Sequence, residues 1–508
     1  MAKFATIRQR GPLIEVSEDG QHPLTGDITT ALTQPLVYTH LTYVRGRDAY
    51  DPVTGLTEGV RPERRRLYQI AANGCLCCQK GFRHTLRQIL RDHGYQVQYV
   101  NYDPPKADTI YRTNWDRLFE NVTLRPGQEE CLSRIAACEE GVIEAVPAFG
   151  KSFMFGVLAM LYPQARIDIV TKSKSVVATI RRHAMRWVPD VGQVGGGKRR
   201  VRRVTVFTAD SLKHSDFSAD MVFADEVHEL MTNRYAEWLS RYWYARMFGF
   251  TATKETRFDN AYHRMEGIFG PTIFKLNYPV AEQLGLVVPI IVQWLRVSPG
   301  FNPCRSLVDL TAKKRHGIWR HDYRNQTIAQ AATSFVEDGY QTLILVETLE
   351  HALFLRQLLP NFQLCYSEQA LDTERRNFFV RNGLMDPNES MTATRRDELR
   401  RGFEDRQFLG AIATGVWSVG VSFDSLQVLV RADGGASATN NMQAPGRVCR
   451  VDSNGKPYGI VVDLQDEFDD KFHGYGISRY RDYGRNGWTQ YSPDGSLRVP
   501  GGRRVGCR

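Results

Sequence analysis

The sequence lacks any long hydrophobic run, and its first residues lack a signal-like apolar core. No stretch of the 508 residues approaches the roughly 20 apolar residues that a membrane-spanning helix needs. The opening Met-Ala-Lys-Phe-Ala-Thr-Ile-Arg is too polar for the core of a secretory signal. These absences argue against a membrane partner, and we expect a cytoplasmic protein.

The cysteines are too irregular to form a disulfide framework. Their number, nine, is odd, and they show no framework spacing, so we expect reduced thiols. Cys75 and Cys78 have the spacing of a zinc knuckle, and His84 follows, but the second Cys-x-x-Cys pair of a structural zinc site is missing. We therefore favour free, partly buried side chains for Cys75, Cys77 and Cys78 at a helix start, with a zinc site as the alternative.

Acidic residues are fewer than lysines and arginines, and the sequence also lacks a nuclease motif. The net charge is +10, which favours a polyanionic partner but also fits a basic protein with no such partner. The hydrophobic fraction of 42% suffices for packed cores. A chain of this length is expected to hold about three domains.

A phosphate-loop signature spans Ala145-Val-Pro-Ala-Phe-Gly-Lys-Ser152. Gly150 allows a tight turn whose amides can face phosphate oxygens, Lys151 can neutralise the β- and γ-phosphates, and the Ser152 hydroxyl can hold Mg²⁺. The apolar runs before and after it predict a buried strand and a helix. Ala145 replaces the usual first glycine. The alternative is a basic helix start that follows a strand.

An acidic pair follows a second strand-like run, Met221-Val-Phe-Ala224. At the end of that strand, Asp225 can bind Mg²⁺ and Glu226 can orient or deprotonate the attacking water. His228 points to the same region and can couple the nucleotide site to another lobe. The alternative is a solvated acidic pair at a strand end.

An arginine motif lies far downstream at Gln443-Ala-Pro-Gly-Arg-Val-Cys-Arg450. Arg447 and Arg450 have the spacing of one face of a helix start, and such arginines can stabilise charge on a γ-phosphate. Two ordinary surface arginines are the alternative.

These three elements, in this order, resemble the superfamily 2 helicases with a DEVH form of the DExH box. Residues 120 to 465 follow the family's motif order, including an adenine-reading Q element at Leu124 to Gln128 and a Ser/Thr-Ala-Thr type motif at Phe250 to Thr253. The resemblance implies ATP as the nucleotide and Mg²⁺ held by Ser152 and Asp225. The catalytic residues that it implies are Lys151, Asp225, Glu226, His228, Gln443, Arg447 and Arg450. The ATP-binding residues are Arg125, Gln128, Ala148, Phe149, Gly150, Lys151 and Ser152.

Nucleic-acid contacts are expected from two sources. The family's strand-contact motifs match segments that contain Lys172, Lys174, Thr208 and Thr414. The basic run Lys198 to Arg203, which contains Lys198, Arg199 and Arg200, is expected in a glycine-flanked loop that could meet phosphates. A solvated loop is the competing interpretation.

A narrower resemblance is to UvsW-type recombination helicases of large tailed phages. It rests on Val194-Gly-Gly-Gly197 before the basic run, on the motif at Thr414 to Ser422, on the total length and on the N-terminal segment Cys78 to Tyr99. The resemblance implies a monomeric motor that remodels branched DNA and meets phage or host recombination proteins in the host cytoplasm.

The expected fold is α/β, with two tandem RecA-like parallel-sheet motor lobes and a small α+β N-terminal accessory domain. We expect the accessory domain at 1–119, the lobes at 120–295 and 296–465, and a C-terminal helix with a basic flexible tail at 466–508. Residues 367–391 are expected to be an insertion, as a mobile surface loop or a duplex-contacting element.

The predicted function is that of an ATP-dependent DNA helicase or translocase working on single-stranded, forked or branched DNA or on an RNA–DNA hybrid. An RNA helicase, or a DNA-dependent ATPase subunit of a restriction or defence complex, remains an alternative. Polarity and DNA-versus-RNA preference are not readable from the residues.

Overall fold

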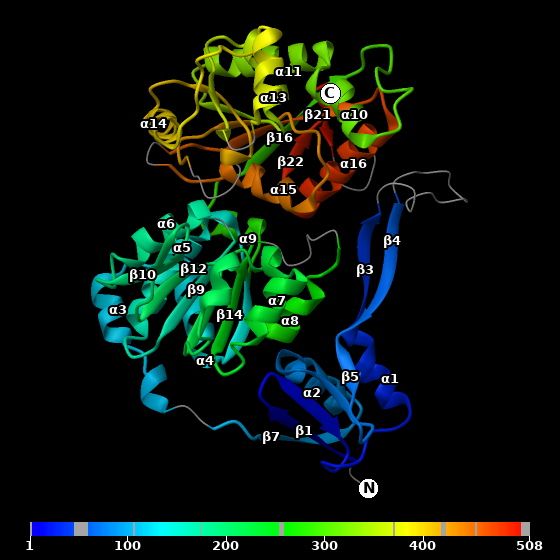
Figure 1. The fold of residues 1–508 in the computed structure, drawn as a ribbon, viewed down its shortest axis with the longest axis vertical. Helices are drawn as coiled ribbons and strands as arrows, with labels where there is room; N and C mark the ends of the chain where they lie inside the picture. Colours follow the sequence, from blue (N-terminus) through cyan, green and yellow to red (C-terminus); the bar gives the residue numbers. More distant parts are fainter. Residues whose placement is uncertain are drawn as a thin grey trace. The chain divides into compact units, whose positions relative to one another are not determined.

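The chain folds as two compact units, Met1–Leu276 and Asn277–Arg508. The computed structural model describes residues 3–44, 59–104, 107–172, 174–252, 259–368, 371–417, 423–452 and 455–498. Each unit holds an eight-stranded sheet, and the first unit also holds a five-stranded sheet and a two-stranded ribbon (Figure 1). The α/β fold class, with two parallel-sheet lobes behind a small α+β domain, is thus confirmed. Throughout the described ranges, every helix is too short or too polar to cross a lipid bilayer.

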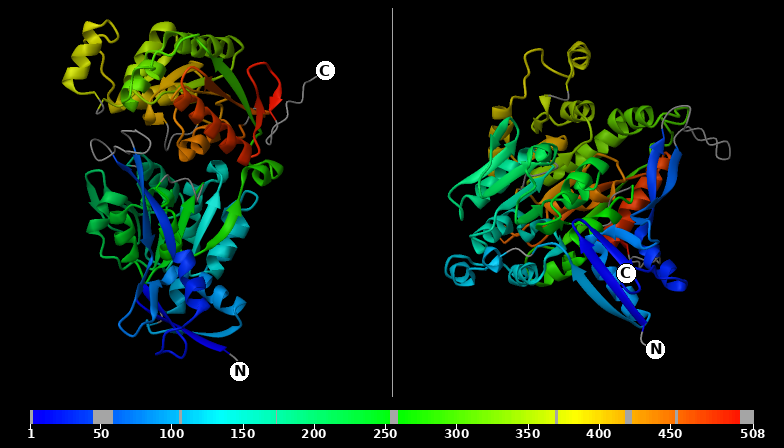
Figure 2. Two further views of the ribbon diagram at one scale, coloured as in Figure 1. Left: turned by 90° about the vertical axis from the view of Figure 1, so that its right-hand side faces the viewer. Right: turned by 60° about the horizontal axis from the view of Figure 1, so that its bottom comes forward.

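The N-terminal domain is a mixed sheet with the order β5-β6-β2-β1-β7. Its elements are β1 (Lys3–Arg10), β2 (Leu13–Ser17), α1 (Asp27–Thr33), β3 (Val37–Val44), β4 (Gly59–Arg66), β5 (Tyr68–Ile70), β6 (Leu76–Gln79), α2 (Arg83–Asp92) and β7 (Tyr95–Asn101). Side chains alternate between the faces of a strand, so Ile7 and Ile14 point to one face and form a core with Leu86 and Leu90 of α2. Figure 2 shows strand β1 in dark blue at the N-terminal end of the chain. Strands β3 and β4 leave this sheet as a separate antiparallel ribbon.

The eight-stranded sheet of the first unit has the order β11-β10-β12-β9-β13-β14-β8-β15, and all its pairs are parallel except β10 with β11. Its elements are α3 (Trp115–Asn121), α4 (Gln128–Ala137), β8 (Glu140–Ala145), α5 (Lys151–Leu161), β9 (Ile167–Thr171), α6 (Lys174–Ala184), β10 (Val191–Gly195), β11 (Lys198–Arg200), β12 (Val204–Thr208), β13 (Met221–Ala224), α7 (Asn233–Ser240), β14 (Arg246–Thr251), α8 (His263–Phe269) and β15 (Thr272–Leu276).

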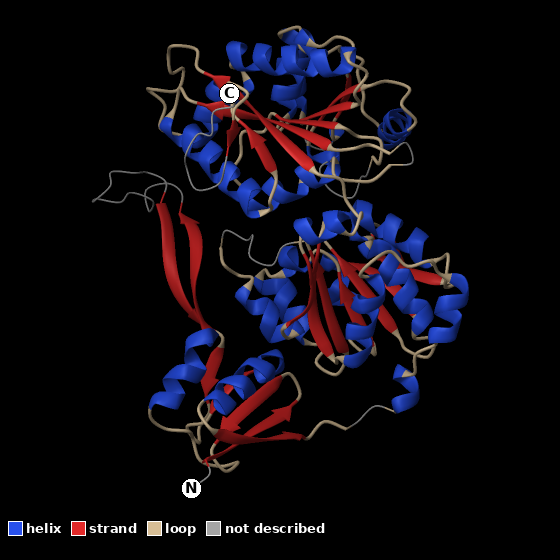
Figure 3. Ribbon diagram, turned by 180° about the vertical axis from the view of Figure 1, so that it is seen from behind, coloured by secondary structure: helices blue, strands red, loops and turns tan. Residues whose placement is uncertain are grey.

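Both faces of this sheet are covered by helices, as Figure 3 shows with red strands between blue helices. Val222 and Ala224 of β13 pack in a core with α7 and α8. Phe223, between them, points the other way and meets Phe155 of α5, with ring centroids 6.2 Å apart. A strand buried on both faces reads as a continuous apolar run, which is why Met221–Ala224 predicts a central strand.

The N-terminal domain is docked on the eight-stranded sheet of the first unit through buried charges. Glu140, the first residue of β8, has a fully buried side chain and lies 3.2 Å from an Arg83 guanidinium nitrogen and 3.6 Å from Lys80 Nζ. Lys80 Nζ also donates to the carbonyl oxygen of Trp243 at 2.6 Å. Gly81 lies so close to the Glu266 carbonyl of α8 that a Cβ has no room there. The domain is therefore fixed to the strand that leads into the phosphate loop.

The second unit is built on the sheet β18-β19-β17-β20-β21-β16-β22-β23, in which only β22 and β23 pair antiparallel. Its elements are α9 (Tyr278–Gln283), β16 (Ile290–Val297), α10 (Leu310–Lys314), α11 (Asp322–Glu337), β17 (Thr342–Leu345), α12 (Leu349–Leu358), β18 (Gln363–Cys365), α13 (Thr373–Arg381), α14 (Ala393–Glu404), β19 (Gly410–Ala413), β20 (Val428–Arg431), α15 (Ala438–Gln443), β21 (Gly459–Asp466), α16 (Asp470–Arg485), β22 (Thr489–Tyr491) and β23 (Leu497–Arg498). Strand β16, from the segment expected to end the first lobe, is part of this sheet.

The expectations for the C-terminal segment and for the segment 367–391 have different outcomes. The C-terminal segment does contain a helix, α16, as predicted, whereas residues 499–508 lie outside the described residues. The segment 367–391, favoured as a mobile loop, instead contains helix α13, and an Arg356–Glu389 ion pair at 2.8 Å ties it to α12.

The cysteines at 75–78 also differ from expectation, because Cys77 and Cys78 lie on strand β6 rather than at a helix start. They are free, and within the described ranges no three His, Cys, Asp or Glu side chains are grouped to hold a metal ion.

Candidate functional site

The segment with the phosphate-loop signature connects β8 to α5 at the carboxyl edge of the eight-stranded sheet of the first unit. Pro147–Phe149 form a single 3-10 turn, and Gly150 adopts a left-handed φ of 88° before Lys151 begins α5. A Cβ at Gly150 would lie 3.1 Å from Nε2 of Gln128, so glycine meets both a conformational and a steric demand. The loop is thus shaped by backbone geometry, even though Ala145 replaces the usual first glycine.

Gln128 of the Q element is hydrogen-bonded both to this loop and to Arg125. Gln128 is 1% exposed; its Nε2 donates to the Phe149 carbonyl at 2.8 Å, and its Oε1 accepts from the Arg125 amide at 2.9 Å. The ring of Phe149 is fully buried and packs on Phe274 at 5.5 Å, so Phe149 can face a ligand only with its backbone. Ala148 is also buried, whereas Ser152 is partly exposed and Arg125 is exposed.

The acidic segment ends β13, and β14 alone separates β13 from β8. Lys151 Nζ lies 2.5 Å from Glu226 Oε1, so the phosphate-loop lysine and the acidic pair meet directly. Glu226 has a left-handed backbone, φ 44° and ψ 52°, which is costly for a non-glycine residue and turns its carboxylate towards the loop. Ligands of parallel α/β sheets bind outside the carboxyl ends of the strands, at this same edge.

Charge coupling within this cluster shifts the pKa values of its members. Burial, reinforced by the neighbouring Glu226 charge, raises the pKa of Asp225 to about 7. Burial is the largest single influence on Glu226 and would raise its pKa, but Lys151, His228 and the Ala252 amide together hold that pKa below its ordinary value. For Lys151, burial lowers the pKa, yet the two carboxylates together outweigh burial and leave it raised. These directions favour an ion pair between Lys151 and Glu226, and they leave Asp225 as a buried carboxyl beside a second negative charge.

His228 connects the acidic segment to the next strand. It is 1% exposed, and its Nδ1 lies 2.8 Å from the hydroxyl of Thr251 at the end of β14 and 3.5 Å from Glu226 Oε2. Thr251 belongs to the Phe250–Thr253 motif, of which Thr253 lies outside the described residues. The structure thus brings together the segment with the phosphate-loop signature, the acidic pair and Thr251 of the Phe250–Thr253 motif at one sheet edge.

The predicted nucleic-acid residues of the first unit lie in different settings. Lys172 and Lys174 are exposed after β9, with Lys172 Nζ 3.7 Å from Glu229. Thr208 is 3% exposed, and its hydroxyl is hydrogen-bonded to Ser211 at 2.7 Å, so that hydroxyl is not offered at the surface.

The basic run is a hairpin strand rather than the expected loop. Strand β11 pairs antiparallel with β10 across Gly196 and Gly197, whose φ values of 61° and 81° suit a tight two-residue turn. Lys198, Arg199 and Arg200 are all exposed on it, and Arg200 is 2.9 Å from Asp190. Arg203 differs from them: its guanidinium donates to the carbonyls of Ala159, Tyr162 and Ala165 and closes the C-terminal end of α5.

The arginine motif lies in the second unit and does not form one helix face. Gln443 ends α15, Pro445–Arg447 form a 3-10 turn, and Arg450 forms an extended bridge with Val287. The expectation that both arginines share one face of a helix start is therefore wrong, because the 3-10 turn ends at Arg447 and residues 448–450 are not helical. Arg447 is 9% exposed, and burial, followed by the Arg450 charge, lowers its pKa to about 10. Arg450 is partly exposed and pairs with Asp424 at 3.2 Å.

The remaining motif residues of the second unit lie at the carboxyl ends of its strands. Thr414 follows β19, and its amide donates to the Cys365 carbonyl at 3.1 Å, while Ser418 to Ser422 lie outside the described residues. Sequence reasoning missed a set of buried arginines, Arg324, Arg431 and Arg479, that surround the segment leading into the arginine motif. Arg324 and Arg479 pair with Asp466 and Asp463 of strand β21, to which no local pattern connects them, whereas Arg431 pairs with Asp433 two positions on.

No protein-family model matches the chain, and no curated protein does. Among solved structures, T4 UvsW is similar over 96% of this chain and 99% of its own, at 16% identity and a TM-score of 0.39. S. cerevisiae Dbp5 bound to RNA and ADP BeF3 covers 74% of this chain and 92% of its own, at 12% identity and a TM-score of 0.49. Mycobacterium smegmatis helicase Lhr bound to ssDNA and AMP-PNP covers 77% of this chain and 51% of its own, at 15% identity and a TM-score of 0.46.

Proposed function

We propose that this chain is an ATP-driven nucleic-acid motor that acts on forked or branched DNA. The observation that carries the proposal is the cluster of Lys151, Asp225, Glu226 and His228 at one sheet edge, next to a glycine-shaped loop. A lysine on a phosphate loop beside two carboxylates supplies a cation for the phosphates, a ligand for Mg²⁺ and a group that positions the attacking water, which are the parts that phosphoryl transfer uses.

The residues divide the chemistry between them. Lys151 binds the β- and γ-phosphates and exchanges its bond with Glu226 for bonds to phosphate oxygens. Glu226, thereby released, orients the attacking water and accepts its proton, a role that fits a carboxylate held ionised. His228 links the position of Glu226 to Thr251 and so to the strand that follows.

Mg²⁺ fits the residues that the sequence nominates for it. Asp225 is 5% exposed, and its pKa of about 7 reflects burial next to Glu226, so a divalent cation would supply the missing positive charge. Asp225 and the Ser152 hydroxyl would hold the ion, which when bound neutralises charge on the phosphates. The arginines of the second unit, Arg447 and Arg450, are proposed to stabilise γ-phosphate charge during hydrolysis.

The nucleic-acid partner is proposed from the exposed cations of the first unit. Lys198 and Arg199 stand on the β10–β11 hairpin, and Lys172 and Lys174 follow β9. A motor must pass any sequence, so contacts to phosphates, which carry no sequence information, suit it.

Preference for branched DNA is proposed for the β3–β4 ribbon of the N-terminal domain. Arg61, Arg64 and Arg66 are exposed on β4. The base of the ribbon is anchored on helix α8, where Tyr38 stacks on His263 with ring centroids 5.3 Å apart. Because the domain is docked, the ribbon keeps a fixed place on the first unit and can hold duplex arms ahead of the motor.

The test is strand separation and binding on matched substrates. The wild type should unwind a short forked duplex with ATP and bind the fork more tightly than a linear strand of the same length. Replacing Arg61, Arg64 and Arg66 by Gln should remove the fork preference while ATP hydrolysis with single strands stays, whereas Arg65→Gln, which removes a cation already paired with Glu63 at 3.0 Å, should not. RNA and DNA forks in competition decide between the two substrates, and equal use of both would overturn the DNA assignment.

A further inference from the structure

Three buried arginines converge on the segment 432–437, which joins β20 to α15. They come from α11, β20 and α16, and each is at most 1% exposed: Arg324, Arg431 and Arg479. Arg324 Nη1 donates to the Ala432 carbonyl and Arg479 Nη1 to the Gly435 carbonyl, both at 2.9 Å. The backbone between β20 and α15 is thus held from three elements of the same unit.

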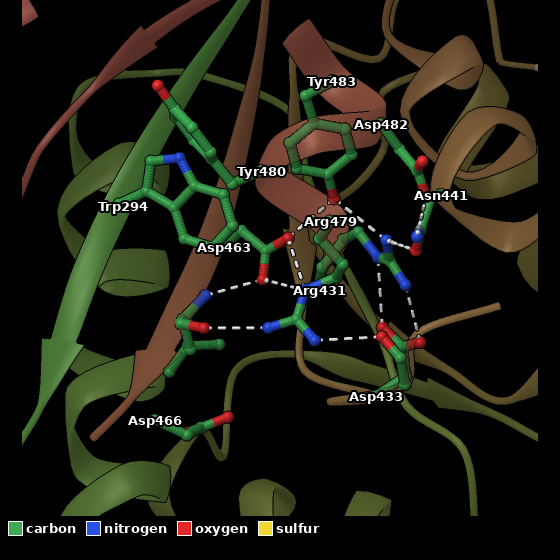
Figure 4. Close-up of polar contacts among 12 residues, drawn as sticks. Trp294, Arg431, Asp433, Asn441, Asp463, Asp466, Arg479, Tyr480, Asp482 and Tyr483 are labelled. Atoms are coloured by element: carbon green, nitrogen blue, oxygen red, sulfur yellow. Dashed lines mark hydrogen bonds and ion pairs between the residues drawn. The ribbon is translucent and has the colours of Figure 1, made fainter. Parts of the chain in front are cut away.

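Each guanidinium is also matched by a carboxylate. Arg324 pairs with Asp466 at 2.9 Å. Figure 4 shows the other two pairs, Arg479 with Asp463 at 3.0 Å and Arg431 with Asp433 at 2.8 Å. A buried charge that loses its partner is strongly destabilising, so such a cluster permits few arrangements of the segments it joins.

Asn441 carries this cluster into helix α15. It is 0% exposed; its Oδ1 accepts from Arg431 Nη1 at 2.7 Å, and its Nδ2 donates to Asp482 Oδ2 at 2.8 Å (Figure 4). The Arg431 nitrogen also donates to the Tyr483 hydroxyl at 2.9 Å. One amide side chain therefore ties α15 to strand β20 on one side and to helix α16 on the other.

The arginine turn follows directly on α15. From Gln443 the chain enters the 3-10 turn Pro445–Arg447 and then the Arg450–Val287 bridge. The far end of the turn is fixed by the Val288 amide, which donates to the Cys449 carbonyl at 2.7 Å. The near end has its side-chain anchor at Asn441.

We infer that Asn441, held between Arg431 and Asp482, is a positioning residue that sets where α15 presents the arginine turn for ATP hydrolysis. The inference rests on the proposed function for its consequence but on contacts within one unit for its geometry. Because Asp482 belongs to helix α16, this role of Asn441 makes α16 a part of the ATP-hydrolysing machinery. A misplacement of about 1 Å of a catalytic group costs on the order of 100-fold in rate, so a side chain that touches no substrate can govern turnover.

The test compares two variants that remove the same number of buried bonds. Asn441→Ala loses the bonds to Arg431 and Asp482. Gln490→Ala, the control, loses a bond from Trp294 Nε1 and a bond to the Tyr480 carbonyl, both 3.0 Å long, on the other side of α16. Both should lower the thermal midpoint, and Asn441→Ala by more, because its two lost bonds go to charged partners. Only Asn441→Ala should lower kcat for ATP, by about 10- to 100-fold with KM changed less than about threefold.

A charge swap and an exchange measurement complete the test. Asn441→Asp alone places a carboxylate against the Asp482 carboxylate and should lower kcat. Adding Asp482→Asn restores a hydrogen-bond donor and an acceptor between the two positions and should recover kcat. Hydrogen–deuterium exchange at 438–450 should accelerate in Asn441→Ala and not in Gln490→Ala. Equal exchange in the two variants, or equal kcat loss, would overturn the positioning role. A wild-type protein without ATPase activity would overturn the proposed function instead, and the exchange result would still decide whether Asn441 fixes this segment.

Discussion

Replacing Glu226 by Gln separates the two tasks of the Lys151–Glu226 pair. The change keeps the shape of the side chain and an oxygen that can accept from Lys151 Nζ, now 2.5 Å from Glu226 Oε1, but removes the negative charge. Lys151 stays charged, so its bond to the amide oxygen remains a hydrogen bond to a charged group, and what is lost is the attraction between two full charges. Lys151 should therefore be released for the phosphates at a cost lower by about 1 kcal/mol.

Two opposite effects follow from this single substitution. ATP should bind about fivefold more tightly, since about 1.4 kcal/mol corresponds to a factor of ten. Turnover should fall by about 10²- to 10⁴-fold, the usual contribution of a general base. Equilibrium titration with a fluorescent ATP analogue gives the first quantity, and steady-state phosphate release gives the second. The control is Lys151→Ala, which should lose both binding and turnover. If Glu226→Gln hydrolyses ATP at a rate within threefold of the wild type, the assignment of the acidic pair is wrong.

Three further predictions follow from other parts of the first unit. Burial raises the pKa of Asp168 from 3.8 to about 6, a shift that corresponds to about 3 kcal/mol. Because the folded pKa lies above the unfolded one, ionised Asp168 destabilises the fold above about pH 6. This destabilisation is relieved as the pH falls from about 6 to about 4. Asp168→Asn should therefore raise the thermal midpoint at pH 7.5 and not at pH 4, and a variant no more stable than the wild type at pH 7.5 would contradict this account. Replacing Lys198 and Arg199 by Gln should flatten the dependence of log affinity on log salt by about 1.4 for single strands, as measured by fluorescence anisotropy, and an unchanged slope would remove the hairpin from the binding surface. Gly81→Ala puts a Cβ against the Glu266 carbonyl, so it should undock the N-terminal domain and accelerate proteolysis between residues 103 and 114, while unchanged cleavage would speak against tight docking.

The parts that could be predicted from the sequence are those whose physical cause is local. A strand buried on both faces must be a continuous apolar run, and a phosphate loop needs glycine at a fixed place. Strands β8 and β13 and the turn at Gly150 could therefore be predicted from the sequence alone. The meeting of Lys151 with Glu226 also follows, because the carboxyl ends of parallel strands share one edge.

The parts that could not be predicted depend on partners far away in the chain. The basic run predicts a loop, because the sequence does not show that Gly196 and Gly197 turn it back on β10. Arg203 resembles an ordinary surface cation, because the sequence does not show that α5 ends beside it. The docking charge Glu140 and the cluster around Asn441 join residues many positions apart, and a single sequence carries no signal for such pairs.

The dependence of ATP hydrolysis on nucleic acid tests the central claim most directly. Steady-state ATPase rates would be measured with no nucleic acid, with single-stranded DNA, with a forked duplex and with RNA, for the wild type and for Lys151→Ala. The account predicts a low basal rate, a rise of at least about tenfold with DNA that is largest on the fork, and no hydrolysis by Lys151→Ala under any condition. A wild-type rate that is the same with and without nucleic acid, or a Lys151→Ala protein that retains it, would contradict the account.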